Sequence, residues 1–260
     1  MIRPYTPGLL LCAALCLTGA PHARAQEAET HIAQAQKTLT EISQLFQAIQ
    51  ARQADLTRNP GAGIKPAPSP DGWNSLFDGE SLGGWKRTTF SDGGKARLEK
   101  NFRGGPSAII VEAGDPLSGI TWTNEVPRTN YEITLEAMKL DGNDFLCGLT
   151  FPVGDSHASL ILGGWGGQVV GISSINNQDA SENETTRTIP FPKDRWFAVR
   201  LRVTPDKIEA WLDDKQIVNV PLKDKVIGLR FGEISRSAPL GMATYKTTAA
   251  YRAIKLRRLN

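Results

Sequence analysis

The chain has 260 residues, of which 40% are hydrophobic and 22% charged, and its formal net charge at pH 7 is +3. These values are ordinary for a globular protein, and the small net charge argues against a nucleic-acid partner. The short basic cluster KLRR at Lys255–Arg258 alternates with aliphatic residues. We therefore expect its charges to lie on the solvated face of a strand.

Residues 1–25 have the anatomy of a secretory signal peptide. Arg3 precedes an apolar run from Leu9 to Leu17, and Ala23-Arg24-Ala25 forms a small-residue cleavage site before Gln26. The apolar run is too short for a membrane span, and no later run is long enough for one. The sequence therefore predicts a secreted or periplasmic protein in which Cys147 is the remaining cysteine.

An amphipathic helix is predicted over residues 27–57. Its apolar residues recur at alternating spacings of three and four, as in a heptad seam; they are Ile32, Ala35, Leu39, Ile42, Phe46, Ile49 and Leu56. Two interpretations stay open: a homo-oligomer through residues 32–56, or a helix that lies alone or against its own domain. A Pro- and Gly-rich linker follows at residues 58–70, so the domain boundary is expected there.

Residues 71–260 are predicted to be all-β. Short apolar runs recur with turn signals between them, and all six tryptophans fall in this part of the chain. From Trp196 to Val203 the pattern alternates cleanly, and two hairpin turns follow, at Thr204–Lys207 and Asp213–Gln216. Many evenly spaced strands without a helical period indicate a two-sheet sandwich of the jelly-roll type.

The stretch from Asp141 to Ser174 is predicted to form three strands joined by two turns. The expected strands are 144–152, 157–162 and 168–173, with a Gly-rich reversal at Gly163–Gly167. Phe145, Cys147 and Leu149 are expected on one side of the first strand and Leu146 on the other. Polar residues sit at the turns, so the stretch is a candidate floor for a sugar site.

The opening GWNSLFDGESLGGW, from Gly72 to Trp85, resembles the start of the 3-keto-disaccharide hydrolase domain family. The closing strand from Tyr251 to Leu259 resembles the family's last strand. The resemblance implies a concanavalin A-like jelly roll that acts on glycosides whose C3 hydroxyl has been oxidised to a ketone. Such a site needs a general base for the C2 proton, a group that stabilises the enolate oxygen, and an acid for the leaving group. A divalent metal could supply the second role, and no cofactor is otherwise implied.

Four residues are candidates for this chemistry. His157 is the first choice as general base, because its ordinary pKa lies near neutrality; the alternative is a rim histidine bonded to its turn. Asp144 and Asp155 flank the two ends of the first predicted strand, and Glu182 lies in a long polar loop. A simple turn stays open for Asp144, and a solvated loop stays open for Glu182.

Substrate-binding candidates are Trp165, Gln168 and Asn176. Glycines around Trp165 allow close approach of a ligand, and an exposed indole can stack on a sugar ring; a tryptophan packed into the core is the alternative. Where many family members carry an Asn-Ser-Gly strand, this chain has DFLCGL from Asp144 to Leu149. The resemblance therefore implies the fold without assigning catalytic residues. A non-catalytic carbohydrate-binding or scaffold module is the alternative function.

Overall fold

The computed structural model describes residues 29, 31–44, 46–47 and 71–260. The chain divides into two compact units, Met1–Ala62 and Gly63–Asn260. The predicted signal peptide, the end of the predicted helix and the predicted linker lie outside the described residues. Within the described residues, no helix is both long and apolar enough to cross a membrane.

The described residues of the N-terminal unit are helical, as predicted for this part of the chain. Their large apolar side chains are exposed, by 58% for Ile32, 65% for Leu39, 57% for Ile42 and 61% for Phe46. These four residues follow the heptad spacing, so they form one unpaired apolar stripe, the Leu39 stripe.

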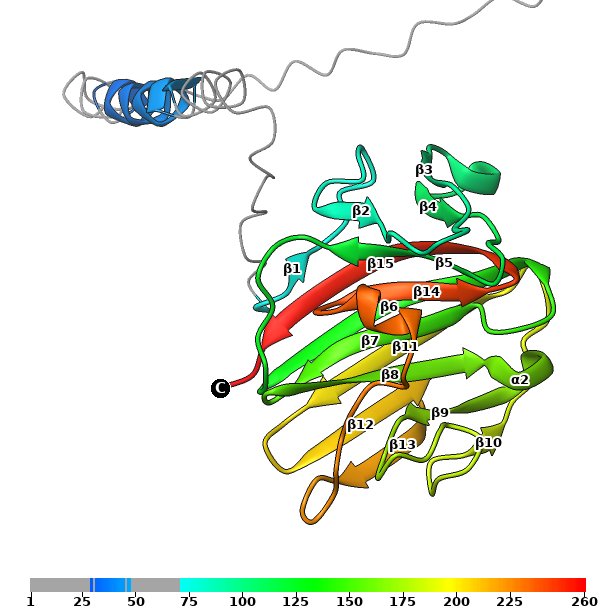
Figure 1. The fold of residues 1–260 in the computed structure, drawn as a ribbon. Helices are drawn as coiled ribbons and strands as arrows, with labels where there is room; N and C mark the ends of the chain where they lie inside the picture. Colours follow the sequence, from blue (N-terminus) through cyan, green and yellow to red (C-terminus); the bar gives the residue numbers. More distant parts are fainter. Residues whose placement is uncertain (1–28, 30, 45, 48–70) are drawn as a thin grey trace, which may run out of the picture. The chain divides into compact units, whose positions relative to one another are not determined.

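The β domain consists of two antiparallel sheets (Figure 1). The eight-stranded sheet runs β13-β12-β11-β6-β15-β4-β3, and β1 pairs with β15. Its strands are β1 (Asn74–Ser75), β3 (Ala96–Glu99), β4 (Ala108–Val111), β6 (Tyr131–Gly142), β11 (Trp196–Val203), β12 (Lys207–Leu212), β13 (Lys215–Pro221) and β15 (Thr247–Arg258).

The seven-stranded sheet runs β10-β9-β8-β7-β14-β5-β2. Its strands are β2 (Trp85–Arg87), β5 (Leu117–Trp122), β7 (Cys147–Val153), β8 (Ser156–Gly163), β9 (Val169–Ser173), β10 (Arg187–Thr188) and β14 (Gly241–Tyr245). Short helices are η1 (Phe102–Gly104), α2 (Gly164–Gly167) and η2 (Glu233–Ser237). The predicted two-sheet jelly roll is confirmed.

One hydrophobic core fills the space between the sheets, and the period-two alternation of the strands builds it. Phe197, Val199, Leu201 and Val203 of β11 are buried in this core, as the sequence pattern predicts. On β8 the core-facing residues are Ala158, Leu160 and Leu162. The residues between them therefore face outward on the seven-stranded sheet.

Two buried tyrosines join the sheets at the two ends of β7. Tyr131 on β6 donates its hydroxyl to the Pro152 carbonyl at 2.5 Å, and Tyr251 on β15 donates to the Leu146 carbonyl at 2.6 Å. Burial raises the pKa of both phenols well above the ordinary value. Both hydroxyls therefore stay protonated donors, and β7 is held at both ends against the opposite sheet.

The predicted central meander forms, with two corrections. The first strand begins at Cys147 rather than Asp144, and Leu146 is buried in the core together with Cys147 and Leu149 instead of facing the other side. The side chains alternate regularly only where β7 pairs with its neighbours. The predicted facing of the residues before Cys147 is therefore wrong. The Gly-rich reversal contains the single turn α2, in which Trp165 has φ 48° and Gly166 has φ 88°.

Candidate functional site

A pocket of about 420 Å³ lies on the outer face of the seven-stranded sheet. We call it the Trp165 pocket. It is lined by residues of four strands and three connecting segments: Leu117, Asp144, Phe145, Ser159, Ile161, Trp165, Ser173, Arg230, Phe231, Glu233, Ile234 and Tyr245. Its volume is within the range of small-molecule sites.

Outward-facing residues of the sheet, among them Ser159, Ile161 and Ser173, line this pocket. One row across five strands reads Gly119, Ala243, Gly148, Ile161 and Gly171. In the next row, the hydroxyls of Thr150 and Ser159 hydrogen-bond to each other at 2.8 Å. Protein side chains cover the glycines of the first row, since a Cβ at Gly148 would lie 3.2 Å from the Phe145 ring and one at Gly119 would lie 3.1 Å from the Phe90 ring.

Asp144 holds the wall that carries Trp165. Its Oδ1 accepts a hydrogen bond from the Phe145 amide at 2.7 Å, and its Oδ2 accepts one from the Gly166 amide at 3.0 Å. Gly167, at φ 102°, admits no side chain, since a Cβ there would lie 2.7 Å from the Asn143 carbonyl oxygen. The Trp165 indole is consequently fixed at the pocket wall with 43% of its surface exposed.

Another part of the lining comes from the connection between β13 and β14. Arg230 forms an ion pair with Asp179 at 3.1 Å, and its guanidinium carbon lies 5.8 Å from the centre of the Trp165 ring. The Glu233 Oε1 accepts the Ser91 hydroxyl at 2.6 Å and lies 3.2 Å from Arg236. An indole, two carboxylates, a guanidinium and the phenol of Tyr245 therefore line one pocket.

Of the predicted catalytic residues, Asp144 lines this pocket. His157 faces the same side of β8 as Ser159, two residues further along, and is not among the lining residues. Its pKa is lowered by burial and by the charge of Arg128. Asp155 lies at the exposed hairpin tip, in an ion pair with Arg128 at 2.7 Å.

The remaining predictions lie away from the pocket lining, with the exception of Trp165. Asn176 is exposed, and its Oδ1 accepts the Val226 amide at 2.8 Å, so it fastens the connection that carries Arg230. Gln168 is exposed beside α2, and its carbonyl accepts the Ile189 amide at 2.9 Å. Glu182 is exposed in the loop after β9.

Sequence reasoning missed Arg230, Glu233 and Tyr245. For Arg230 and Glu233 the available signal was the long connection from Leu222 to Leu240, because long ordered connections in compact domains are often functional. Tyr245 ends β14, outside that connection. As for metals, no three His, Cys, Asp or Glu side chains gather as a ligand set within the described part of the chain. The two pocket carboxylates already bind protein donors, so the donor set does not fit a three-ligand metal centre.

The two packed antiparallel sheets and the pocket on one outer face define a concanavalin A-like jelly-roll protein. A family model described as a 3-keto-alpha-glucoside-1,2-lyase-like domain matches residues 72–257. The chain belongs to this family of carbohydrate-active domains, which confirms the resemblance found in its opening and closing motifs.

Several solved structures are similar over most of their length. The carbohydrate-binding module CBM66 from Bacillus subtilis has 13% identity and a TM-score of 0.43, covering 67% of this chain and 95% of that one. A putative glycosyl hydrolase from Parabacteroides distasonis has 12% identity and a TM-score of 0.45, covering 76% and 98%. Domain 4 of AbnA, a GH43 extracellular arabinanase from Geobacillus stearothermophilus, has 12% identity and a TM-score of 0.42, covering 68% and 82%. A comparison with curated proteins found no match.

Proposed function

We propose that the Trp165 pocket binds a glycoside oxidised to a ketone at C3 and cleaves its glycosidic bond by elimination followed by hydration. The observation that carries this proposal is convergence: Asp144, Arg230, Glu233 and Tyr245 line the same pocket as Trp165. A pure binding site needs an aromatic face and hydrogen-bonding groups. Carboxylates, a guanidinium and a phenol around one cavity suit proton transfer as well.

The reaction follows from the acidity that the ketone gives to C2. A base takes the C2 proton, and the electron pair forms an enolate with its charge on the C3 oxygen. The C1–O bond then breaks, a C1–C2 double bond forms, the ketone returns, and the leaving oxygen takes a proton. Water finally adds across the double bond, with hydroxyl at C1 and hydrogen at C2.

We assign the removal of the C2 proton to the Asp144 carboxylate. Each of its oxygens accepts one backbone amide, and this leaves lone pairs free toward the pocket. The bond to the Gly166 amide also places the carboxylate beside Trp165, where a stacked sugar ring would lie.

The other roles go to the remaining pocket groups. Arg230 supplies positive charge for the enolate oxygen. The Tyr245 hydroxyl donates a proton to the leaving oxygen, and its ring is braced 5.7 Å from that of Phe145. Glu233, oriented by Ser91 and Arg236, accepts a hydrogen bond from the water that adds at C1.

The test compares a 3-keto-disaccharide with its unoxidised parent and follows glycosidic cleavage. Asp144→Asn and Tyr245→Phe should each lower turnover roughly a hundredfold or more, the scale of a positioned acid or base. Trp165→Ala should mainly raise KM. Asp155→Asn and Glu182→Gln are matched controls outside the pocket and should keep wild-type turnover.

His157→Ala separates the two candidate bases. Loss of activity in His157→Ala with full activity in Asp144→Asn would show that His157, and not Asp144, is the base that removes the C2 proton. Binding of both sugars without cleavage of either would reject the enzyme and favour the carbohydrate-binding module.

We also propose that the protein is exported, from the signal anatomy of residues 1–25. The mature protein isolated from the producing cell should then begin at Gln26 by mass spectrometry. A cytoplasmic protein that retains residues 1–25 would contradict export.

A further inference from the structure

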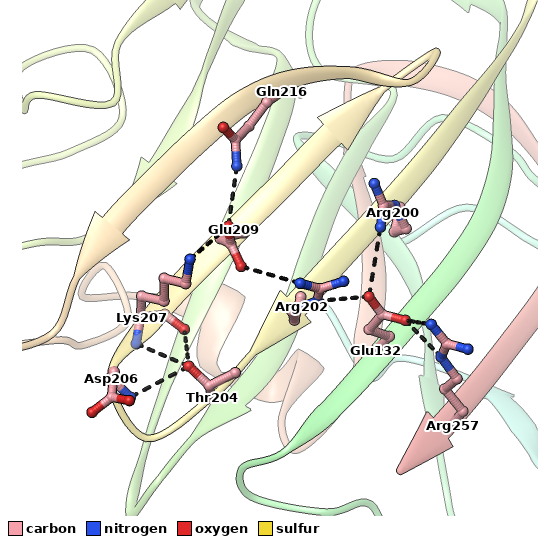
Figure 2. A network of polar contacts seen from close by, with 9 residues as sticks. All are labelled: Glu132, Arg200, Arg202, Thr204, Asp206, Lys207, Glu209, Gln216 and Arg257. Atoms are coloured by element: carbon pink, nitrogen blue, oxygen red, sulfur yellow. Dashed lines mark hydrogen bonds and ion pairs between the residues drawn. The ribbon is translucent and has the colours of Figure 1, made fainter. Parts of the chain in front are cut away.

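The outer face of the eight-stranded sheet, on the far side of the core from the Trp165 pocket, carries an arginine cluster (Figure 2). Three arginines converge on Glu132 of β6, whose side chain is completely buried. Arg202 Nε donates to it at 2.7 Å, Arg257 Nε donates at 2.6 Å, and Arg200 Nη1 lies 3.6 Å away. One carboxylate thus faces three guanidinium groups.

The neighbouring acid does not remove this surplus of positive charge. Glu209 of β12 lies 2.9 Å from Lys207 and 3.7 Å from Arg202. It also accepts a hydrogen bond from the side-chain amide of Gln216 at 3.2 Å. Figure 2 shows the two acids bridged by Arg202. The cluster formed by Arg200, Arg202, Lys207, Arg257, Glu132 and Glu209 therefore holds more cations than carboxylates.

Arg200 is the member of the cluster with donors to spare. Its guanidinium carbon lies 3.7 Å from the centre of the Trp211 ring, so the indole fixes the orientation of the plane. The side chain is 34% exposed. Within the described residues it makes no hydrogen bond, and its N–H edge is left for an outside acceptor.

A hollow of about 230 Å³, the Lys255 hollow, lies beside Arg200 and includes Thr134, Trp211, Asp214, Ala253 and Lys255 in its lining. A bulge in β15 shapes it: the register with β6 shifts between Arg252 and Lys255, and Ala253 is held at φ 52°. A non-glycine residue in this conformation is strained, and bulges of this kind often accompany binding sites.

The charges around the hollow favour an anion. Lys255 is exposed, and its side chain has no ion pair or hydrogen bond among the described residues. Glu136 also lines the hollow, but Arg252 pairs with it. Among the acids that line the hollow, this leaves Asp214 against the charges of Arg200 and Lys255.

We propose that the Lys255 hollow is a second carbohydrate site that binds the carboxylate of a uronate unit in an acidic polysaccharide. The planar edge of Arg200 matches a carboxylate in a two-pronged hydrogen bond, and Lys255 adds a point charge. Trp211, the Ala253 methyl and the Thr134 hydroxyl give the mixed lining that a sugar ring needs. Since ligand pockets usually start at about 300 Å³, this hollow takes a single ring rather than a long segment.

The test measures binding of trigalacturonate, neutral maltotriose and inorganic phosphate to the full chain by calorimetry. Trigalacturonate should bind, and its affinity should fall with added salt. Lys255→Gln and Arg200→Gln should each weaken this binding about tenfold, the scale of one charge-assisted hydrogen bond. Cleavage in the Trp165 pocket should be unchanged in Lys255→Gln, so failure of either site is distinguishable from failure of the other.

Lys86→Gln and Arg187→Gln, which remove exposed cations from the other sheet, are the matched controls and should bind like wild type. The Lys255 side chain has no ion pair or hydrogen bond among the described residues, so its variant tests the site even where Arg200→Gln unfolds. Equal binding of trigalacturonate and maltotriose, or binding of neither, would overturn the proposal. Binding of phosphate alone, with the same dependence on Lys255, would overturn the uronate as ligand.

Discussion

Glu132 is the residue on which the outer face of the eight-stranded sheet depends. Burial acts to raise its pKa, but hydrogen bonds and charges from Arg202 and Arg257 outweigh that effect, so the pKa is lowered. A carboxyl group whose folded-state pKa is depressed contributes stability above its unfolded pKa. That contribution is lost as the pH falls through the folded value.

We therefore expect Glu132→Gln to destabilise the β domain by about 3 kcal/mol at pH 7, because it removes the acid that Arg200, Arg202 and Arg257 share and leaves only Arg202 with a second acid, Glu209, nearby. The free energy of unfolding in urea measures this. The difference from wild type should shrink as the pH is lowered below the ordinary glutamate pKa of 4.5.

Glu125→Gln is the control, since Glu125 is exposed and a surface substitution should change stability by less than about 0.5 kcal/mol. Equal stability of Glu132→Gln and wild type at pH 7 would show that the arginines repack at no cost.

At the scale of residues, the sequence indicates part of the candidate pocket and no more. Asp144 and Trp165 stand at turns of the central meander, where polar and glycine-flanked residues draw attention. Glu233 reaches the pocket through a contact with Ser91, which is far away in sequence. Such long-range contacts depend on how the sheets stack, and a local pattern does not encode them.

Among the elements, the N-terminal helix presents the clearest unexplained surface. The Leu39 stripe is exposed and follows the heptad spacing. We propose that it pairs with the same stripe of a second chain, because burying such a seam between helices is the usual source of coiled-coil stability. Leu39→Asp with Phe46→Asp should then convert an oligomer into a monomer without unfolding the β domain. Sedimentation equilibrium and circular dichroism measure the two effects.

Lys37→Asp makes a matched change off the stripe and should leave the oligomer intact. A monomeric mass for the wild-type chain would reject pairing through this helix.

Strand elements differ in how readily the sequence predicts them. The alternation from Trp196 to Val203 gives both the extent and the facing of β11, because one side is buried and the other is charged. The start of β7 is harder, since Phe145 faces the pocket while Leu146 and Cys147 both enter the core. Apolar residues on two surfaces erase the alternation that marks a strand end.

At the scale of the whole molecule, the β domain carries its own core and its own ties between sheets. The core residues all come from the family-matched part of the chain, and Tyr131 and Tyr251 link the sheets within it. We expect residues 71–260 to fold without residues 1–70, with a cooperative urea transition at the same midpoint as the full chain. An unfolded circular dichroism spectrum for residues 71–260 would contradict this.

The first strand of the β domain pairs with the last one. This first strand, β1, is two residues long, and it pairs Asn74 with Leu256 and Ser75 with Lys255 of β15. Tension applied through the chain before Asp71 would reach β1 before any other strand and pull it away from β15. β15 would stay in place, since β6 and β4 hold its other contacts. The Trp165 pocket lies on the other sheet and would keep its shape. Separation of β1 from β15 would therefore relieve the tension before it reached the pocket.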